Sequence, residues 1–324
     1  MMTLCQVHLR TSRNEVMMRL ASSNSNPAIA QVPLLAALRP KQWTKNLLIF
    51  AALLFSIRFT QLATWQAAII AFAAFCLFSS AGYLVNDLLD VEADRQHPTK
   101  RLRPIASGSV SRMTALLTIV VLVVSGVALA LSLGPLFTAV AIGYLVVSVS
   151  YSVWLKHYVL LDLFGIAAGF VLRAAAGAVA ITVPISPWLY VCTGLVALFL
   201  ALGKRRNELI LLESSAGQHR RNLDDYTVEL VDQLTLIVTA AAVIAYSLYT
   251  ISGDGRSTNP AMMLTIPFVM YGLFRYLYLV HIRKLGGNPE DLLLQDRPLS
   301  ISVIAWILTC GAILILTSRA APVT

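Results

Sequence analysis

A cluster of carboxylates is the first feature of this sequence that could carry out chemistry. Asp87, Asp90 and Asp94 follow Tyr83 and Asn86 at spacings of three and four residues, which places all five side chains on one face of a helix. Carboxylates crowded on one face repel one another, and a divalent cation relieves that repulsion. Oxygen ligands favour Mg²⁺, which typically takes one or two carboxylates and completes its shell with water and phosphates. The sequence therefore predicts a magnesium site at Asn86, Asp87, Asp90 and Asp94, and the alternative is a solvated helix end.

Cations follow the carboxylates closely. Lys100 and Arg103 come within a dozen residues, in a stretch that Pro98 and Pro104 prevent from being one continuous helix. A metal cluster beside a basic cluster suits a diphosphate, because the metal bridges its oxygens and the side-chain cations neutralise the rest. His97 is expected to be structural, and membrane topology alone would also place cations here.

The composition places these residues in a membrane protein. Of the 324 residues 57% are hydrophobic and only 13% are charged, about half the globular norm of roughly 25%. This excludes an ordinary cytosolic enzyme, a disordered protein and a secreted disulfide scaffold. The four cysteines show no metal-ligand spacing, and no disulfide is expected.

Apolar runs predict an all-α, polytopic membrane protein. A helix crossing the bilayer needs roughly 20 apolar residues, and nine runs qualify. The first is the weakest because Arg39, Lys41 and Lys45 lie in its opening turns, so an amphipathic helix on the membrane surface is the alternative there. The predicted spans are 36–57, 64–88, 113–132, 135–152, 159–180, 187–203, 233–252, 261–281 and 299–318.

The charges also predict an orientation. With the N-terminus in the cytoplasm, twenty lysines and arginines fall on the inner side and three on the outer side. The basic balance, a net charge of +9, is thus a consequence of topology, and no nucleic-acid partner is expected. The long polar loops lie on the cytoplasmic side, where we expect the active site. Residues 1–32 are polar without a signal peptide and predict a disordered tail, followed by a single transmembrane domain over 33–324.

The motifs resemble a known family. Asn86, Asp87, Asp90 and Asp94, followed by the stretch 100–108, are similar to the first signature of the UbiA superfamily of intramembrane prenyltransferases. The resemblance covers about 33–318. It implies a nine-helix bundle with an active site that faces the cytoplasm.

Three further motifs point to one branch of that superfamily. Residues 39–46 read RPKQWTKN, residues 151–156 read YSVWLK, and residues 203–208 read GKRRNE where aromatic prenyltransferases carry a second aspartate-rich DxxxD motif. Together they resemble the decaprenyl-phosphate phosphoribosyltransferases. That resemblance implies a bacterial plasma-membrane enzyme that uses phosphoribosyl pyrophosphate as the donor and a polyprenyl phosphate as the acceptor, for arabinan precursors of the cell envelope.

Two polyanionic substrates need many cations. Substrate binding is therefore expected of Tyr83 and Asn86 together with Lys45, Lys100, Arg103, Lys156, Arg173 and Lys204. Arg173 lies inside a span, where an arginine normally has an anionic partner. A ligand phosphate and a neighbouring carboxylate are both open as that partner. Arg275 is expected to snorkel to the interface.

The implied reaction releases diphosphate from C1 of the ribose while a lipid phosphate attacks that carbon. Asp87, Asp90 and Asp94 are the expected catalytic residues, through the Mg²⁺ that they hold, and no general base is required. The acidic loop residues Asp224, Asp225, Asp291 and Asp296, with Arg297, either cap the site or are solvated.

Two other functions stay open. One is an aromatic prenyltransferase of the same superfamily, and the other is a lipid-phosphate transporter, although no internal repeat supports the latter. Membrane lipids are expected to surround the chain, and a homo-oligomer is left open.

Overall fold

The structure is a computed structural model that describes residues 33–56, 61–184, 187–213, 225–252, 260–285, 287 and 289–320. The predicted disordered tail, 1–32, and the loop residue Asp224 lie outside the described residues.

Helices form all of the regular structure in these described ranges, which confirms the predicted all-α class. In chain order they are α2 (Pro33–Leu38), η1 (Pro40–Phe50), α3 (Ala51–Phe55), α4 (Leu62–Leu89), α5 (Val91–Gln96), η3 (Lys100–Leu102), α6 (Arg112–Ser132), α7 (Pro135–Val153), η4 (Leu155–His157), α8 (Leu161–Ala180), α9 (Pro187–Glu213), α10 (Val228–Ser252), η6 (Pro260–Thr265), α11 (Ile266–His281), α12 (Pro289–Gln295) and α13 (Arg297–Ala320).

Within the described chain, eight helical segments are long and apolar enough to cross a membrane. They are α4, α6, α7 with η4, α8, α9, α10, η6 with α11, and α13. These correspond to the second to ninth predicted spans, and they make the chain a multi-pass membrane protein. Of the nine predicted spans, eight are such helices among the residues that the structure describes.

The first predicted span is the exception, because it is broken into α2, η1 and α3. Arg39 separates α2 from η1 in a left-handed conformation with φ 53°, and Pro40 then begins the 3₁₀ helix. The segment is not a surface helix either. It packs against α4 and α8, and Asn46 and Ile49 are completely buried. Contacts with the bundle, rather than its own hydrophobicity, shape this segment.

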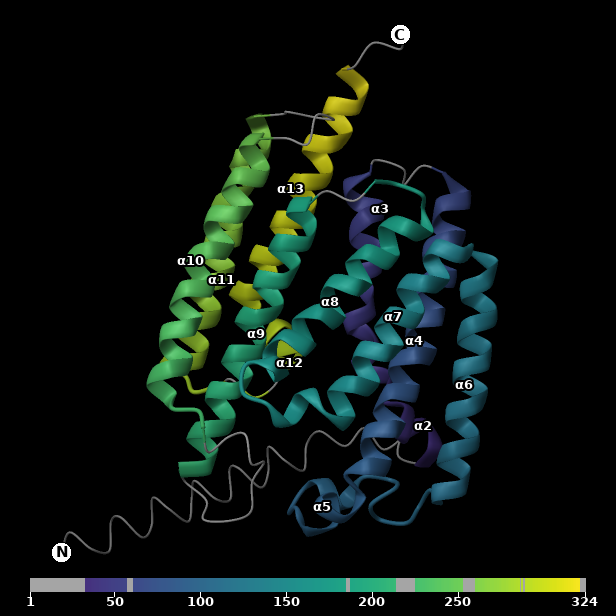
Figure 1. Cartoon of the computed structure of the whole chain (residues 1–324). Coiled ribbons are helices and arrows are strands. Elements are labelled where there is room, and N and C mark those ends of the chain that lie inside the picture. Colours follow the sequence, from purple (N-terminus) through teal and green to yellow (C-terminus); the bar gives the residue numbers. More distant parts are fainter. Residues whose placement is uncertain are drawn as a thin grey trace, which may run out of the picture.

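The helices run side by side with α5 at one end of the bundle, at the bottom of Figure 1. An aromatic core holds α4 and α7 together, where Phe75 packs on Phe78, Phe137 and Tyr144. Gly177 of α8 lets η1 approach closely, since a Cβ there would lie 2.0 Å from the carbonyl oxygen of Ile49.

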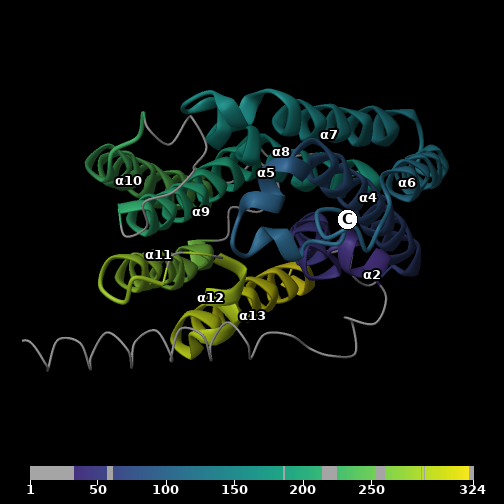
Figure 2. The same cartoon turned by 90° about the horizontal axis from the view of Figure 1, so that it is seen from below.

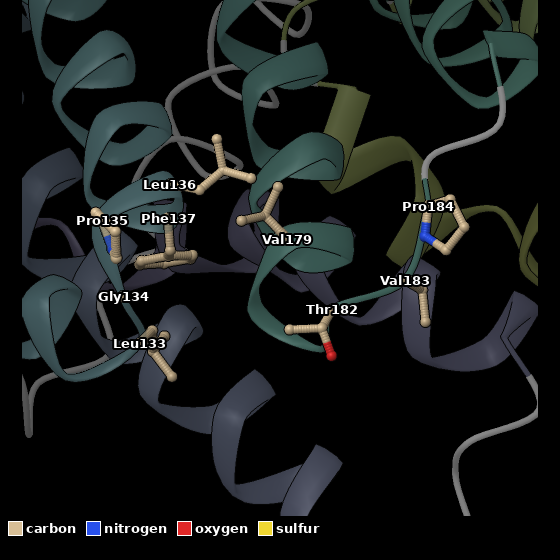
Figure 3. Close-up of a pocket in the computed structure, with 9 residues that line it drawn as sticks. All are labelled: Leu133, Gly134, Pro135, Leu136, Phe137, Val179, Thr182, Val183 and Pro184. Carbon is tan, nitrogen blue, oxygen red and sulfur yellow. The ribbon is translucent and has the colours of Figure 1, made fainter.

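The two ends of the bundle differ. The view from below shows α5 toward the middle of the surrounding helices (Figure 2). An apolar groove of about 440 Å³ lies at the opposite end, where α6 meets α7 and where α8 has just ended (Figure 3). Its lining includes Leu136, Phe137, Val179 and Val183. The groove carries no charged side chain, so the chemistry suggested by the sequence belongs to the α5 end.

Candidate active site

The acidic stretch turns a corner at Asp90. The predicted continuous helical face through Asp94 is wrong, because α4 ends at Leu89 and α5 begins at Val91. Asp90 adopts φ −92° and ψ 6°, and its N–H donates to the carbonyl of Asn86 at 2.9 Å. This turn divides the polar side chains into two pairs that face different cations.

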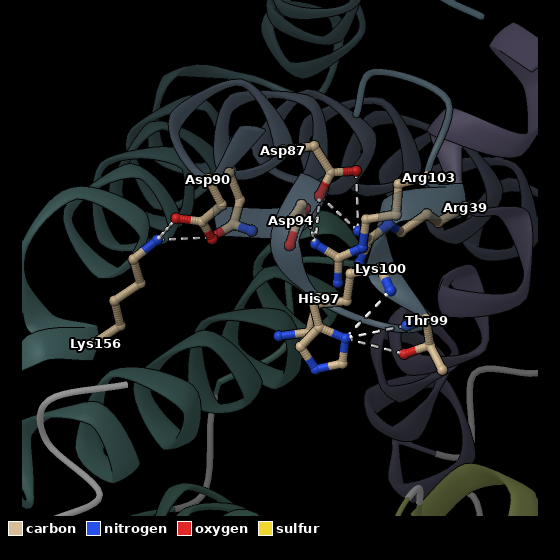
Figure 4. Close-up of polar contacts among 10 residues, drawn as sticks. Arg39, Asp87, Asp90, Asp94, His97, Thr99, Lys100, Arg103 and Lys156 are labelled. Carbon is tan, nitrogen blue, oxygen red and sulfur yellow. Dashed lines mark hydrogen bonds and ion pairs between the residues drawn. The ribbon is translucent and has the colours of Figure 1, made fainter. Parts of the chain in front are cut away.

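The first pair is Asp87 and Asp94, both buried. Arg103 bridges them, donating from Nη1 to Asp87 Oδ1 at 3.1 Å and to Asp94 Oδ2 at 2.6 Å. Arg39 donates from Nη2 to both oxygens of Asp87, at 2.6 and 2.9 Å. Figure 4 shows both guanidinium groups directed at this pair. Charge-assisted hydrogen bonds of this kind are the strong ones in proteins.

The second pair is Asn86 and Asp90, which meet at Lys156 from η4. The Lys156 ammonium lies 2.7 Å from Asp90 Oδ1 (Figure 4). It also lies 3.3 Å from Asn86 Oδ1. Only 3% of the Lys156 side chain is exposed, against 26% for Asp90. A buried ammonium needs such a partner. Because Asp90 is the more exposed of the two side chains, solvent reaches this ion pair from the Asp90 side.

Arg39 is a site residue that sequence reasoning missed. In the sequence Arg39 is one of the topological cations and the first residue of the RPKQWTKN motif, and neither feature distinguishes it from Lys41 and Lys45 as an Asp87 partner. The structure places its guanidinium 5.0 Å from the centre of the Tyr83 ring as well as on Asp87. Backbone strain persists where surrounding contacts determine it, and here the ion pair with Asp87 holds the left-handed Arg39 in place.

The loop after α5 is organised by His97. Its Nδ1 accepts hydrogen bonds from the backbone N–H groups of Thr99 and Lys100, both at 3.3 Å, which confirms a structural role. The turn brings Lys100 and Arg103 back toward the end of α4 (Figure 4). The predicted basic cluster is therefore beside the acidic one.

The donor set can be tested against a metal ion. No three His, Cys, Asp or Glu side chains within the described residues are arranged as a metal site. However, Asn86 with Asp90, and Asp87 with Asp94, each direct two oxygens at one cationic nitrogen. Two oxygen ligands per ion, completed by water and phosphates, are what Mg²⁺ commonly uses. The residues fit a magnesium ion that arrives with a phosphate substrate.

This site can be compared with known proteins. The sequence matches the UbiA prenyltransferase family over residues 47–286. The chain belongs to the UbiA prenyltransferase family. It is 37% identical to a decaprenyl-phosphate phosphoribosyltransferase of Mycobacterium tuberculosis over 88% of this chain and 95% of that protein. A protein of the same name from Mycolicibacterium smegmatis is 36% identical over 86% and 91%. These similarities confirm the resemblance inferred from the motifs.

The fold agrees with that membership. A UbiA homologue from Archaeoglobus fulgidus, solved bound to DMAPP and Mg²⁺, superimposes with a TM-score of 0.70. The match covers 87% of this chain and 99% of the other, at 19% sequence identity. The likeness therefore shows a shared helical bundle.

Arg173 of this UbiA member lies deep in the bundle. Arg173 is twelve residues into α8 from Leu161, or roughly 18 Å along the axis. Its described partners are neutral: Asn46 Oδ1 at 2.7 Å, the Tyr144 hydroxyl at 2.7 Å and the Gly169 carbonyl at 3.0 Å. Among the described residues no carboxylate pairs with it, which corrects that alternative.

The basic run at residues 203–208 stands where aromatic prenyltransferases carry the second aspartate motif. Its two arginines form ion pairs with carboxylates of this chain. Arg205 is buried and pairs with the fully buried Asp162, to which the Tyr226 hydroxyl also donates at 2.8 Å. Burial raises the pKa of Tyr226, and the neighbouring carboxylate adds to this. Arg206 pairs with Asp232 at 2.6 Å. Lys204 is exposed on α9, and Lys45 is half-buried on η1.

Asp296 is an acidic loop residue with a specific ion pair. Asp296, just before α13, receives Arg275 Nη2 at 2.8 Å and the backbone N–H of Leu299 at 2.9 Å. The hydrogen bond from Arg275 holds the pKa of Asp296 below its ordinary value. Arg275 therefore reaches a specific carboxylate at the end of the neighbouring span, and the expectation that it snorkels stays a prediction.

Proposed function

We propose that this chain transfers the 5-phosphoribosyl group from phosphoribosyl pyrophosphate to a polyprenyl phosphate and releases diphosphate. The observation that carries the proposal is the set of two oxygen pairs, each facing a cation, at one end of a UbiA bundle. The similarity to decaprenyl-phosphate phosphoribosyltransferases over nearly nine tenths of the chain supports the choice of donor and acceptor.

The same side chains would bind the leaving group. Asn86 with Asp90, and Asp87 with Asp94, are the residues that would hold Mg²⁺, which when bound neutralises charge on the diphosphate. Lys156 and Arg103 already contact these oxygens and would donate to the phosphates. The solved relative that is bound to Mg²⁺ supports a divalent metal here. Fixed cations of this kind stabilise charge as it develops on a leaving oxygen.

The bond changes need no proton acceptor. The C1–O bond to diphosphate breaks and its electron pair leaves with the diphosphate oxygen. An anionic oxygen of the lipid phosphate forms the new bond to C1, and this oxygen is already deprotonated at neutral pH. Catalysis then consists of holding both phosphate groups in line and stabilising charge. Lys45, Lys100 and Lys204 are proposed as further phosphate contacts.

We place the acidic end of the bundle at the cytoplasmic face of a bacterial plasma membrane, because the lysines and arginines predict that orientation. The soluble donor would reach the site from that side, and the lipid tail from the bilayer. The product, a lipid-linked pentose phosphate, would supply arabinan precursors of the cell envelope. Residues 33–324 are proposed to form one domain.

A donor screen tests the function. The full-length protein, purified in detergent with Mg²⁺, would be given labelled phosphoribosyl pyrophosphate with decaprenyl phosphate. A parallel reaction would contain geranyl diphosphate with labelled 4-hydroxybenzoate, and its prenylated product would be separated from the free acid by chromatography. We expect a chloroform-soluble labelled product only in the first reaction, and none with Asp90→Ala. Turnover in the second reaction alone would instead identify an aromatic prenyltransferase. Activity that survives Asp90→Ala would contradict the assigned site.

A further inference from the structure

A row of polar contacts fastens η1 to α4. At the α5 end Arg39 binds Asp87. One step further along, the Trp43 indole N–H donates to Ser80 Oγ at 3.0 Å. Deeper still, Asn46 Nδ2 donates to Ser79 Oγ at 3.3 Å and lies at the same distance from the sulfur of Cys76. We call these contacts of Arg39, Trp43 and Asn46 with α4 the seam. The seam connects the middle of the bundle to the candidate active site.

The segment that makes these contacts is a 3₁₀ helix. Trp43, Asn46 and Ile49 are spaced by three residues, and side chains at that spacing eclipse one another in a 3₁₀ helix. In an α-helix the same three would spread over about 120°, so their present directions toward α4 and α8 would change. A 3₁₀ run of 11 residues is long, since runs beyond 3–4 residues are uncommon. Tertiary contacts must therefore stabilise it.

Arg173 provides the most deeply placed of the contacts described here. It fixes Asn46 from the α8 side at 2.7 Å, and the amide of Asn46 then has both its oxygen and its nitrogen engaged. The guanidinium is itself held by the Tyr144 hydroxyl and stacks at 4.6 Å from that ring. Only 6% of Arg173 is exposed. α7, α8, η1 and α4 thus meet at one buried hydrogen-bonded point.

We infer that Arg173 is a positioning residue, which acts through Asn46 to keep η1 extended so that Arg39 reaches Asp87. An 11-residue segment spans roughly 22 Å as a 3₁₀ helix and about 16.5 Å as an α-helix. With its Ile49 end held by α8, relaxation to an α-helix would withdraw Arg39 by about 5 Å. The 2.6 Å contact with Asp87 would then be lost. For catalysis this inference rests on the proposed phosphoribosyl transfer.

A double-mutant cycle tests whether Arg173 acts through Arg39. Arg173→Met should lower kcat/KM by about 10²-fold, the effect of a small displacement in an active site. In an Arg39→Gln background the same substitution should cause less than a threefold further loss, because the displaced group is already gone. Equal losses in both backgrounds would overturn the inference, as would a kcat/KM for Arg173→Met equal to that of the wild type. Asn46→Ala serves as a second variant with the same expected pattern.

A distance measurement is independent of catalysis. Spin labels at Lys41→Cys on η1 and Leu117→Cys on the exposed face of α6 would report the reach of η1 by pulsed electron paramagnetic resonance, with Cys5 and Cys192 replaced by serine. Arg173→Met should shift the distance distribution by up to about 5 Å or broaden it to that range. An unchanged distribution would overturn the inference even if the protein proved to use another donor.

A matched control separates positioning from general weakening. Tyr246→Phe removes a buried hydroxyl that contacts Thr265 at 2.6 Å and Trp306 at 2.7 Å, on helices that do not carry the seam. This variant should lower thermal stability while leaving kcat/KM and the label distance unchanged. If Tyr246→Phe alters kcat/KM and the label distance to the same extent as Arg173→Met does, the positioning role is refuted.

Discussion

Lys156 offers the most direct test of the site. Its ammonium is almost fully buried and contacts Asp90 and Asn86. Lys156→Gln keeps most of the side-chain volume and removes the charge. Breaking a fully buried ion pair costs about 3–5 kcal/mol. Because Asp90 is 26% exposed, water can solvate the remaining carboxylate, and we expect a stability loss of about 1–2 kcal/mol.

The effect of Lys156→Gln on turnover should be larger than its effect on folding. Losing one fixed donor to developing negative charge typically lowers kcat by 10²–10³-fold, or about 3–4 kcal/mol. The assay is phosphoribosyl transfer to decaprenyl phosphate at saturating Mg²⁺, with thermal unfolding followed on the same samples. Lys41→Gln is the matched control, since Lys41 is exposed on η1 and should leave both quantities unchanged.

The double variant Lys156→Gln with Asp90→Asn distinguishes two roles for Lys156. If the lysine served only to neutralise Asp90, removal of both charges would restore stability and leave activity no lower than in Asp90→Asn alone. We expect stability to recover and activity to fall below that of Asp90→Asn alone, because Lys156 would also donate to the leaving group. A kcat/KM for Lys156→Gln within threefold of the wild type would refute its role in binding the leaving group.

Three further predictions concern the metal, the packing of η1 and the loop before α13. Chelation of divalent ions should abolish turnover, and Mg²⁺ should restore it; activity that persists in excess chelator would contradict a metal at the site. Gly177→Ala forces a Cβ against the Ile49 carbonyl and should cost about 1–3 kcal/mol in thermal unfolding, whereas Gly143→Ala, with open space around it, should cost almost nothing. The Asp296 pKa is depressed by Arg275, so its stabilisation is fully present above the ordinary pKa of about 3.9 and is lost as pH falls through the lower folded value. Asp296→Asn should therefore lower stability at pH 7 and flatten the acid limb of the stability curve, and an unchanged acid limb would show that this pair does not contribute.

Much of the candidate site could be predicted from local sequence. Asp87, Asp90 and Asp94 were found because carboxylates at a membrane boundary are costly unless something binds them. Arg103 followed from its nearness along the chain. The sequence does not predict the turn at Asp90, because residues spaced by three and four fit one continuous helix and two consecutive helices equally well.

Partners far apart in the chain were harder to predict. Lys156 was expected to bind substrate, but its pairing with Asp90, 66 residues away, was not foreseen. Arg39 was overlooked as a site residue for the same reason, since Asp87 lies 48 residues away from it. Arg173 was expected to meet an anion, and the structure gives it Asn46, 127 residues away, with other neutral groups.

By itself, the sequence determined the membrane setting, the all-α class, the acidic cluster and the family, since these follow from hydrophobicity, charge and short motifs. Only the tertiary structure decided which cation faces which carboxylate and that the first span is a broken 3₁₀ segment. The physical reason is that apolar length measures the free energy of transfer into lipid. The conformation of residues 40–50 depends instead on hydrogen bonds and close packing from α4 and α8, whose positions only the folded bundle defines.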